Sequence, residues 1–321
     1  MTEWRPCSGP RAAMSRRGLL RRIRRHFDAA GMLEVDTPAL SPYAVSDVHI
    51  ESFATAESAL SRRPLYLHTS PEYCMKRLLA AGFPDIYSIC RVFRDGESGR
   101  QHQPEFTMIE WYRLGMGFDE IIEDSLALIA AALGDAAPAG APVIVDYADA
   151  MQRACGVDVH AADAAALAAA AGADAALRAA IGDTRNDWLD LLLAKRVVTT
   201  FAPDRLTVLR HFPASQAALA RLCPADPRVA DRFEVFLGTV ELANGYVELT
   251  DAREQAERID RDNDVRERRG RARRPVDENL LDALAAGLPQ CAGVAMGLER
   301  LQMVHDNTDD IRDVITFAFD A

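Results

Sequence analysis

The expected strands of this 321-residue chain come in adjacent pairs, with no helix between the two members of a pair. Residues 86–94 and 105–113 have strand-like composition, and the polar, glycine-containing segment between them predicts one hairpin with a long loop. Asn244-Gly245 predicts the turn of a second hairpin. The short strands expected around that turn are 232–236, 239–242 and 246–249. Without strand–helix–strand alternation, the pattern indicates an α+β fold with a mostly antiparallel sheet.

Helical spacing of apolar residues predicts the helices around these strands. The first begins at Ser15, and Ser70-Pro71-Glu72 is typical of a helix start, with Ser70 as the N-cap. Fourteen of the twenty residues from 161 to 180 are alanine, which indicates a helical insertion over about 135–205. Further helices are expected over 119–133, over 251–269 and from Leu298 onward. We expect residues 1–14 to form a flexible basic arm and residues 15–321 to form one domain.

The charge distribution restricts the classes of partner. The net charge is −11, yet residues 5–25 contain eight arginines and residues 266–274 contain six. A body this acidic excludes a general nucleic-acid binder. The basic first helix is either a contact for an acidic protein or an interface helix with solvated arginines, and we expect 266–274 to be a solvated loop.

Targeting and redox features are few. No apolar run approaches the roughly 20 residues of a membrane helix, and no secretory signal is visible, so we expect a cytoplasmic protein without membrane contacts. The six cysteines form no CxxC pair and have no zinc-type spacing. They are typical of free thiols in a reducing compartment.

Three segments have the residue types that phosphate and amine chemistry needs. In the first, Arg91–Tyr112, an arginine at a strand end suits a phosphate and an aromatic residue suits a purine; the alternative is an ordinary surface hairpin. In the second, Gly293–Arg300, small residues leave one strand face bare for a ligand; the alternative is a packed core strand.

The third segment is a series of carboxylates with a spacing of seven, at Glu234, Glu241 and Glu248. Residues seven apart lie on opposite faces of one straight strand. Across two hairpin turns, however, three neighbouring strands can bring these side chains to one side. There they suit Mg²⁺ beside phosphates or a cationic substrate group. The alternative is three solvent-facing acids on an amphipathic sheet.

Together and in this order, these features resemble the catalytic domain of class II aminoacyl-tRNA synthetases, above all that of lysyl-tRNA synthetase. Residues 15–38, 91–112 and 293–300 resemble the three class motifs. With no anticodon-binding barrel expected before the first motif, the chain is most similar to the stand-alone members that lysylate a protein instead of a tRNA. The resemblance implies a class II core with a mostly antiparallel six-stranded sheet flanked by helices, a homodimer and no tRNA partner.

The resemblance also implies a nucleotide site. Arg94 is expected to bind the α-phosphate of ATP and Arg300 the γ-phosphate, as the two catalytic residues, while Phe106 stacks on adenine. Further ATP contacts are expected from Asp95, Gly96, Gln103, Glu241, Leu242 and Gly297. The carboxylates of Glu234 and Glu241 are expected to hold Mg²⁺.

For the amino acid, the resemblance implies a pocket with carboxylates at both ends. Glu72 is expected to meet one amino group, and Tyr112 and Glu248 the distal ammonium. The full expected set is Ser70, Pro71, Glu72, Tyr112, Glu248 and Ala295. The implied reaction activates (R)-β-lysine as an adenylate and transfers it to a lysine ε-amino group of elongation factor P.

The chain departs from the synthetase pattern at three places. Arg94-Asp95-Gly96-Glu97 stands where lysyl-tRNA synthetases have Arg-Asn-Glu. Gln103 replaces the usual Asn, and Ala295 replaces a glycine, which we interpret as favouring the β isomer of lysine. Two other functions are open at this point: a truncated synthetase-like amino-acid ligase, and an inactive regulatory paralogue. The second is disfavoured because the motif arginines and carboxylates are present.

Overall fold

The computed structural model describes residues 4–56 and 61–319, which divide into two compact units. The first unit comprises the described residues up to Gly117, then Glu123–Ala137, and those from Thr250 onward. The second comprises Phe118–Ile122 and Pro138–Leu249. Within the described ranges, no helix is long and apolar enough to cross a membrane.

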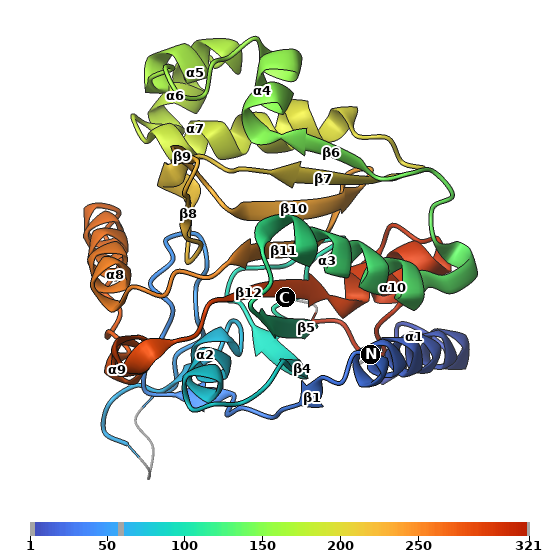
Figure 1. The fold of residues 1–321 in the computed structure, drawn as a ribbon. Coiled ribbons are helices and arrows are strands. Elements are labelled where there is room, and N and C mark those ends of the chain that lie inside the picture. Colours follow the sequence, from blue (N-terminus) through green and yellow to red (C-terminus); the bar gives the residue numbers. More distant parts are fainter. Residues whose placement is uncertain (1–3, 57–60, 320–321) are drawn as a thin grey trace. The chain divides into compact units, whose positions relative to one another are not determined.

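The first unit has four strands in the order β1-β4-β5-β12 (Figure 1). The pairs β4–β5 and β5–β12 are antiparallel, and β1–β4 is parallel. These strands are β1 (Leu33–Glu34), β4 (Ile86–Phe93), β5 (Glu105–Leu114) and β12 (Cys291–Gly297). A separate two-stranded sheet pairs β2 (Leu40–Ser41) with β3 (Tyr66–Leu67).

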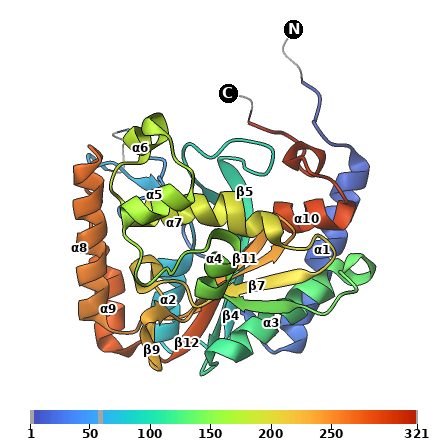
Figure 2. The same cartoon turned by 90° about the horizontal axis from the view of Figure 1, so that it is seen from above.

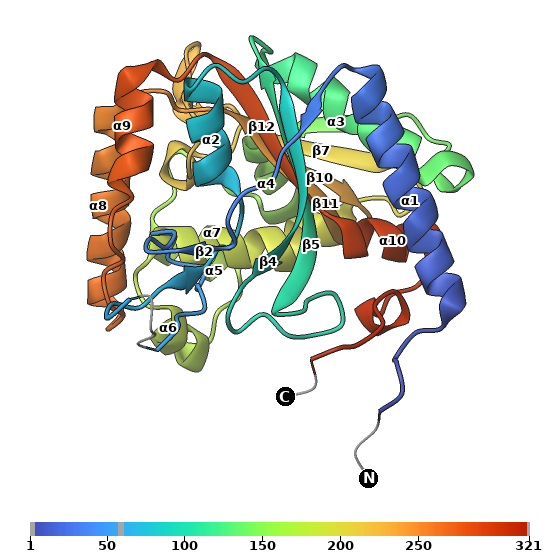
Figure 3. The same ribbon diagram turned by 90° about the horizontal axis from the view of Figure 1, so that it is seen from below.

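The helices of the first unit pack against this sheet in two groups. Helices α2, α8 and α9 lie side by side, and α1 lies beside α10 (Figure 3). The core below α2 and α9 contains buried residues such as Met75, Ile86 and Leu284. The bounds are α1 (Pro10–Ala29), α2 (Glu72–Ala80), α8 (Ala252–Arg268), α9 (Glu278–Gly287) and α10 (Leu298–Asp306), with α3 (Phe118–Leu133) running from the second unit into the first.

The second unit has four strands in the order β11-β10-β7-β6, with helices on one face (Figure 2). Tyr147, Trp188 and Phe236 are buried together where α4 and α7 cover β7 and β10. The strands are β6 (Val143–Asp146), β7 (Leu206–Arg210), β10 (Arg232–Leu237) and β11 (Val240–Val247), with a small sheet of β8 (Leu222–Cys223) and β9 (Asp226–Ala230). The helices are α4 (Tyr147–Cys155), α5 (Ala164–Ala170), α6 (Ala175–Ile181) and α7 (Arg185–Leu192).

The α+β class and the mostly antiparallel pairing are confirmed, whereas the predicted strand count of six is too low. The larger sheets of the two units contain eight strands, four in each, rather than six. Two of the strand pairs, β1–β4 and β6–β7, are parallel. One extra strand, β6, lies inside the predicted helical insertion over 135–205. Val143, Ile144 and Val145 form a run of β-branched residues, which favours a strand but was outweighed by the alanine-rich composition of the insertion.

Two predicted helix boundaries are wrong. The first helix begins at Pro10 rather than Ser15, because a proline fits the first helical turn, where its missing N–H is not needed. The described part of the predicted arm is attached through Cys7 N–H, which donates to Thr316 O at 2.7 Å. The second helix has Pro71 as its N-cap, although Ser70 Oγ still accepts from Glu72 N–H at 3.0 Å.

The alanine-rich stretch is helical, as predicted, and forms two short helices. Gly172, with φ of +67°, ends the turn after α5, and a second helix follows. Asp163 and Asp174 cap α5 and α6, each accepting a hydrogen bond of 2.8 Å from a backbone N–H three residues later. Alanine content therefore predicts helix but not where the helix is interrupted.

The second arginine cluster is only in part the solvated loop that we expected, since Arg268, Arg271 and Arg273 are exposed but Arg266 is buried. Arg266 is 1% exposed, and its Nη2 donates to Glu51 Oε2 at 2.8 Å. Arg274 also pairs with Glu51, and Arg271 lies 3.8 Å from the same carboxylate. One acid distant in sequence therefore organises this segment, which local composition does not reveal.

Candidate functional site

The β4–β5 hairpin brings together the residues expected to bind the base and the α-phosphate. Arg94 follows β4, and its N–H donates to Pro104 O at 2.8 Å, which closes the hairpin. Its guanidinium carbon lies 5.1 Å from the centre of the Phe106 ring. Arg94 also lies 3.7 Å from Glu97, so the glutamate that is displaced by one position still contacts the motif arginine.

The neighbouring predicted residues lie at the beginning and end of the hairpin loop. Gly96 has a φ of +81°, which explains why a glycine occupies this position. Asp95 and Gly96 line an open hollow of about 500 Å³ together with Arg266 and Arg274. Gln103 is buried, and its Oε1 accepts from Phe319 N–H at 2.7 Å, so the C-terminal segment holds this side chain.

Arg300 lies in the first turn of α10, directly after β12. Its Nη2 donates to His102 Nε2 at 2.6 Å, and its Nε donates to Gln101 O at 3.4 Å. The motif-three arginine therefore contacts the loop of the motif-two hairpin. His102 is a contact that the sequence analysis missed, because nothing in its local sequence indicates a partner 198 residues away.

One face of β5 connects Phe106, which is expected to stack on the base, to a second group of predicted residues. Phe106, Met108, Glu110 and Tyr112 alternate along the strand and share that face. From Phe106 to Glu110 the strand rises about 13 Å, so one extended ligand can reach both. On the opposite face, Trp111 Nε1–H donates to Asp124 Oδ2 at 2.9 Å.

The small residues of β12 lie beside this face. Gly293, Ala295 and Gly297 pair with Tyr112, Glu110 and Met108. A Cβ built on Gly297 meets no atom within 4 Å, so the space beside it is open. The strand is therefore open at Gly297, whereas Gly293 at its other end is buried, and Ala295 pairs with Glu110.

Ser70, Glu72, Lys76, Glu110 and Tyr112 of the first unit form a group that we call the amine pocket, after the ligand expected there. They come from α2, from β5 and from the residues just before α2, and three of them are buried. Ser70 Oγ–H donates to Glu110 Oε2 at 2.7 Å, and Tyr112 O–H donates to Glu110 Oε1 at 2.8 Å. Lys76 Nζ donates to Glu72 Oε1 at 2.6 Å. Glu110 and Lys76 are 3% and 1% exposed.

Sequence reasoning found three of the five members of the amine pocket and missed two. Glu110 lies two residues before Tyr112 on the same strand face, and Lys76 lies one helical turn after Glu72. These spacings were the available signals. Burial raises the pKa of the Glu110 carboxyl to about 7, with the nearby Glu72 acting in the same direction.

The acid face, as we call Glu234, Glu241, Asn244 and Glu248, belongs to the second unit. The predicted Asn244-Gly245 turn is wrong: β11 continues through both residues, which pair with Glu234 and Phe233, and the chain turns at Gly238. Glu241 and Glu248 therefore do not lie on separate strands, as the sequence analysis assumed.

A β-bulge replaces the missing turn. Ala243 pairs with Val235 and Glu241 with Phe236, so Leu242 is an extra residue in β11. This insertion reverses the alternation of side chains, so that residues seven apart on one strand share a face. Glu234 lies directly opposite Asn244, and all four members of the acid face therefore point to the same side.

Electrostatics distinguish Glu234 within the acid face. Burial raises the pKa of Glu234 to about 7, Arg232 opposes this shift, and the neighbouring Glu241 adds to it. Arg232 Nη2 donates to Glu234 Oε1 at 2.7 Å. The Asn244 Oδ1 atom is buried and has no hydrogen-bond partner among the described residues. These hard oxygen donors are of the kind that Mg²⁺ prefers.

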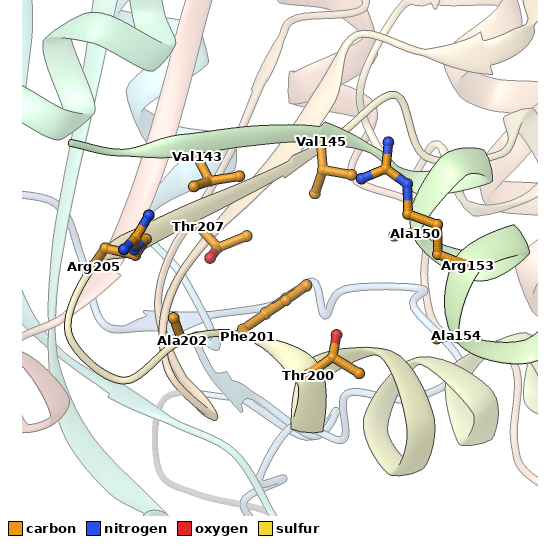
Figure 4. Close-up of a pocket in the computed structure, with 10 residues that line it drawn as sticks. All are labelled: Val143, Val145, Ala150, Arg153, Ala154, Thr200, Phe201, Ala202, Arg205 and Thr207. Carbon is orange, nitrogen blue, oxygen red and sulfur yellow. The ribbon is translucent and has the colours of Figure 1, made fainter. Parts of the chain in front are cut away.

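Two other features of the second unit lie outside the predicted site. A cavity of about 360 Å³ lies between β6, β7, α4 and Phe201, with Arg153 and Arg205 at its rim (Figure 4). No predicted site residue lines it. A group formed by His211, Cys223 and Asp231 has ligand atoms within 4.8 Å of one another, but Arg221 already pairs with Asp231 at 2.8 Å.

Comparison with known proteins agrees with these arrangements. The sequence profile of tRNA synthetases class II (D, K and N) matches residues 10–321. The elongation factor P–(R)-β-lysine ligase of Sodalis glossinidius is 43% identical over 320 residues, covering 98% of this chain and 97% of the relative. The ligase of the same name from Salmonella paratyphi B is 43% identical over 321 residues, covering 99% and 98%. The chain therefore belongs to the class II tRNA synthetase family of the D, K and N type.

Proposed function

We propose that this protein is an ATP-dependent ligase that activates (R)-β-lysine and transfers it to a lysine ε-amino group of elongation factor P. The observation that supports this most directly is the shared face of β5. It carries Phe106 for the base and Glu110 with Tyr112 for an amine, beside the small residues of β12. Relatives of nearly the same length are named for this reaction.

In the first step, a carboxylate oxygen of the amino acid attacks the α-phosphorus of ATP and pyrophosphate leaves. No protein nucleophile is needed. Arg94 stabilises the charge that develops on the α-phosphate, and Arg300 that on the leaving pyrophosphate. In the second step, the lysine amine of the protein substrate attacks the acyl carbon, AMP leaves, and the amine loses a proton.

The amine pocket orients the amino acid for both steps. An ammonium group loses strong hydration on entering a buried site, so it needs carboxylate partners there. Tyr112, which the resemblance placed beside Glu248 at the distal ammonium, donates to Glu110, so we assign it instead to the end of the ligand that Glu72 and Glu110 would hold. Glu248 is assigned to the distal ammonium. Ser70 keeps Glu110 in place, and Ala295 limits the space opposite it.

Mg²⁺ fits the acid face and belongs to the proposal. Glu234 and Glu241 would hold the ion, and the buried Asn244 Oδ1 supplies a third oxygen on the same side. A bound Mg²⁺ neutralises phosphate charge during adenylation. Without it, Arg232 is the cation that Glu234 contacts.

We also propose a homodimer, a cytoplasmic site of action and no tRNA substrate. Apolar side chains near the first class motif support the dimer, since Met14 on α1 and Leu33 on β1 are 64% and 45% exposed. A single species of twice the 35.2 kDa chain mass in light scattering is the expected result.

The decisive experiment measures the intact mass of elongation factor P after incubation with this protein, ATP, Mg²⁺ and (R)-β-lysine. We expect a gain of one lysyl group on one lysine, largest with the β isomer. Parallel reactions contain α-lysine, or lysine tRNA in place of the factor. Charged tRNA without modified factor would instead indicate a synthetase-like ligase. Absence of product and of pyrophosphate exchange would indicate a regulatory paralogue.

A further inference from the structure

Lys76 is a buried cation inside the amine pocket for which the proposed reaction assigns no role. It lies on the inner face of α2, one turn after Glu72, and its side chain is 2% exposed. The chain contains only two lysines among 37 basic residues. A compact ammonium therefore stands here in a protein that otherwise uses arginine.

The ammonium of Lys76 contacts one carboxylate of the first unit and acts electrostatically on a second. Its Nζ lies 2.6 Å from Glu72 Oε1. Glu110 is close enough that the Lys76 ammonium lowers the pKa of its carboxyl. Ser70 and Tyr112 each donate one hydrogen bond to Glu110 and contribute no charge. Two carboxylates and one ammonium leave a net charge of −1 when all three are ionised.

We propose that Lys76 is a positioning residue that acts as the permanent internal counter-ion of the amine pocket, so that the pocket accepts one substrate ammonium. Without Lys76, the carboxylates of Glu72 and Glu110 would together carry a charge of −2 with no internal counter-ion. One of the two would then take up a proton, which returns the charge of the pocket to −1. With Lys76, both carboxylates stay available as hydrogen-bond acceptors. This inference rests on the proposed function, because it assumes an amine ligand.

The proposal has a consequence for pH dependence. The titratable groups around Glu110 are Glu72 and Lys76 on α2, Tyr112 on its own strand, and Cys90 on β4. Of these, only Lys76 carries positive charge at neutral pH. Its removal therefore raises the pKa of Glu110, and the pH at which the pocket begins to bind an ammonium rises with it.

The test compares three variants by pyrophosphate exchange between pH 6 and 9. Lys76→Met removes the charge and keeps the length, while Lys76→Gln keeps hydrogen-bond donors without the charge. Arg77→Met is the control, because it removes a positive charge from an exposed position on the same helix. For both Lys76 variants we expect the KM for (R)-β-lysine to rise about 10-fold or more, with the KM for ATP within twofold of wild type.

We also expect the acid limb of log kcat/KM to move up by about one pH unit in both Lys76 variants and to stay in place in Arg77→Met. A wild-type profile in Lys76→Gln would overturn the proposal, because hydrogen bonding alone would then suffice. If Lys76→Met does not fold, Lys76→Gln and a ¹³C NMR titration of Glu110 decide the question. No exchange by the wild-type protein with any diamino acid would instead refute the proposed function.

Discussion

The amine pocket and the acid face are two groups of carboxylates built in different ways. In the amine pocket, Lys76 contacts Glu72 on the same helix, and the hydroxyl groups of Ser70 and Tyr112 contact Glu110. In the acid face, strand register and the Leu242 bulge set the direction of the side chains, and Arg232 contacts Glu234. Side-chain packing therefore fixes the net charge of the amine pocket, whereas backbone geometry fixes the direction in which the side chains of the acid face point.

This difference agrees with the ligands that we propose. A single substrate ammonium is neutralised by a pocket with a net charge of −1. Two carboxylates and one internal lysine give that charge. A divalent ion beside phosphates needs several oxygens on one side, with few cations competing for them. Substitutions in the acid face should therefore have larger effects on the reaction than substitutions outside both groups.

The largest effect is expected in the acid face. Glu241→Gln keeps the shape of the side chain but removes a carboxylate proposed to hold Mg²⁺. We expect kcat for pyrophosphate exchange to fall by about 10²–10³-fold. Glu257→Gln, on the surface of α8, is the matched control and should behave as wild type. If kcat for Glu241→Gln falls only slightly, and excess Mg²⁺ does not change it, the acid face does not hold the ion and the proposed difference between the two groups is wrong.

The second prediction concerns how stability depends on pH. The pKa of Glu110 is about 7, above the 4.5 of an unfolded glutamate, so the folded protein binds a proton more tightly. The stabilisation from this group is complete below about pH 4.5 and is lost as pH rises to about 7. The loss amounts to about 3 kcal/mol.

Glu234 should contribute in the same direction, since burial raises its pKa to about 7 as well. Urea unfolding between pH 4.5 and 8 should therefore show a decline that Glu110→Gln reduces by about half. A decline of unchanged size in Glu110→Gln would show that the amine pocket does not titrate in this range. Added (R)-β-lysine should reduce the decline for wild type only.

The third prediction concerns the nucleotide end of β5. Phe106→Ala removes the ring proposed to stack on adenine, beside the Arg94 guanidinium. We expect the KM for ATP to rise about 10-fold while the KM for (R)-β-lysine stays within twofold. Equal increases in both constants would mean that the two ends of this strand face are not separate subsites.

The smallest effect is expected in the alanine-rich helices, which belong to neither group. Asp163→Ala removes the cap of α5 and should lower the free energy of unfolding by about 1 kcal/mol. Asp174→Ala, which removes the cap of α6, should do the same. Pyrophosphate exchange at 25 °C should not change in either variant. A loss of activity would show that this part of the second unit takes part in the reaction.

Local patterns predicted the parts of the site that lie close together in sequence. Arg94 and Phe106 meet because an antiparallel hairpin brings its two ends together, and two strand-like segments around a polar loop predicted that hairpin. Gly293, Ala295 and Gly297 share one face because every second residue of a strand points the same way. The assignment to a family followed from the order of such motifs, and the comparisons confirm it.

The failures have equally specific causes. Asn244-Gly245 is a strong turn signal, but pairing with Glu234 and Phe233 in β10 keeps it extended, so tertiary context outweighs local propensity. Glu110 and Lys76 were missed because each looks like an ordinary charged residue in its own segment. What distinguishes them is their burial and, for Glu110, a hydrogen bond from Ser70, 40 residues away.

The amino-acid sequence is sufficient to establish which chemical groups this protein has and the order in which they appear: an arginine at a strand end, another at a helix start, small residues on one strand, and carboxylates seven apart. It is sufficient because periodicity and turn chemistry act over a few residues. The tertiary structure alone decided which of these groups are buried and which share a face. The bulge at Leu242 determines which carboxylates of the acid face share a side. The burial of Lys76 beside Glu72 places a positive charge in the amine pocket. Both depend on contacts with other segments, since burial and pairing are properties of the packed chain.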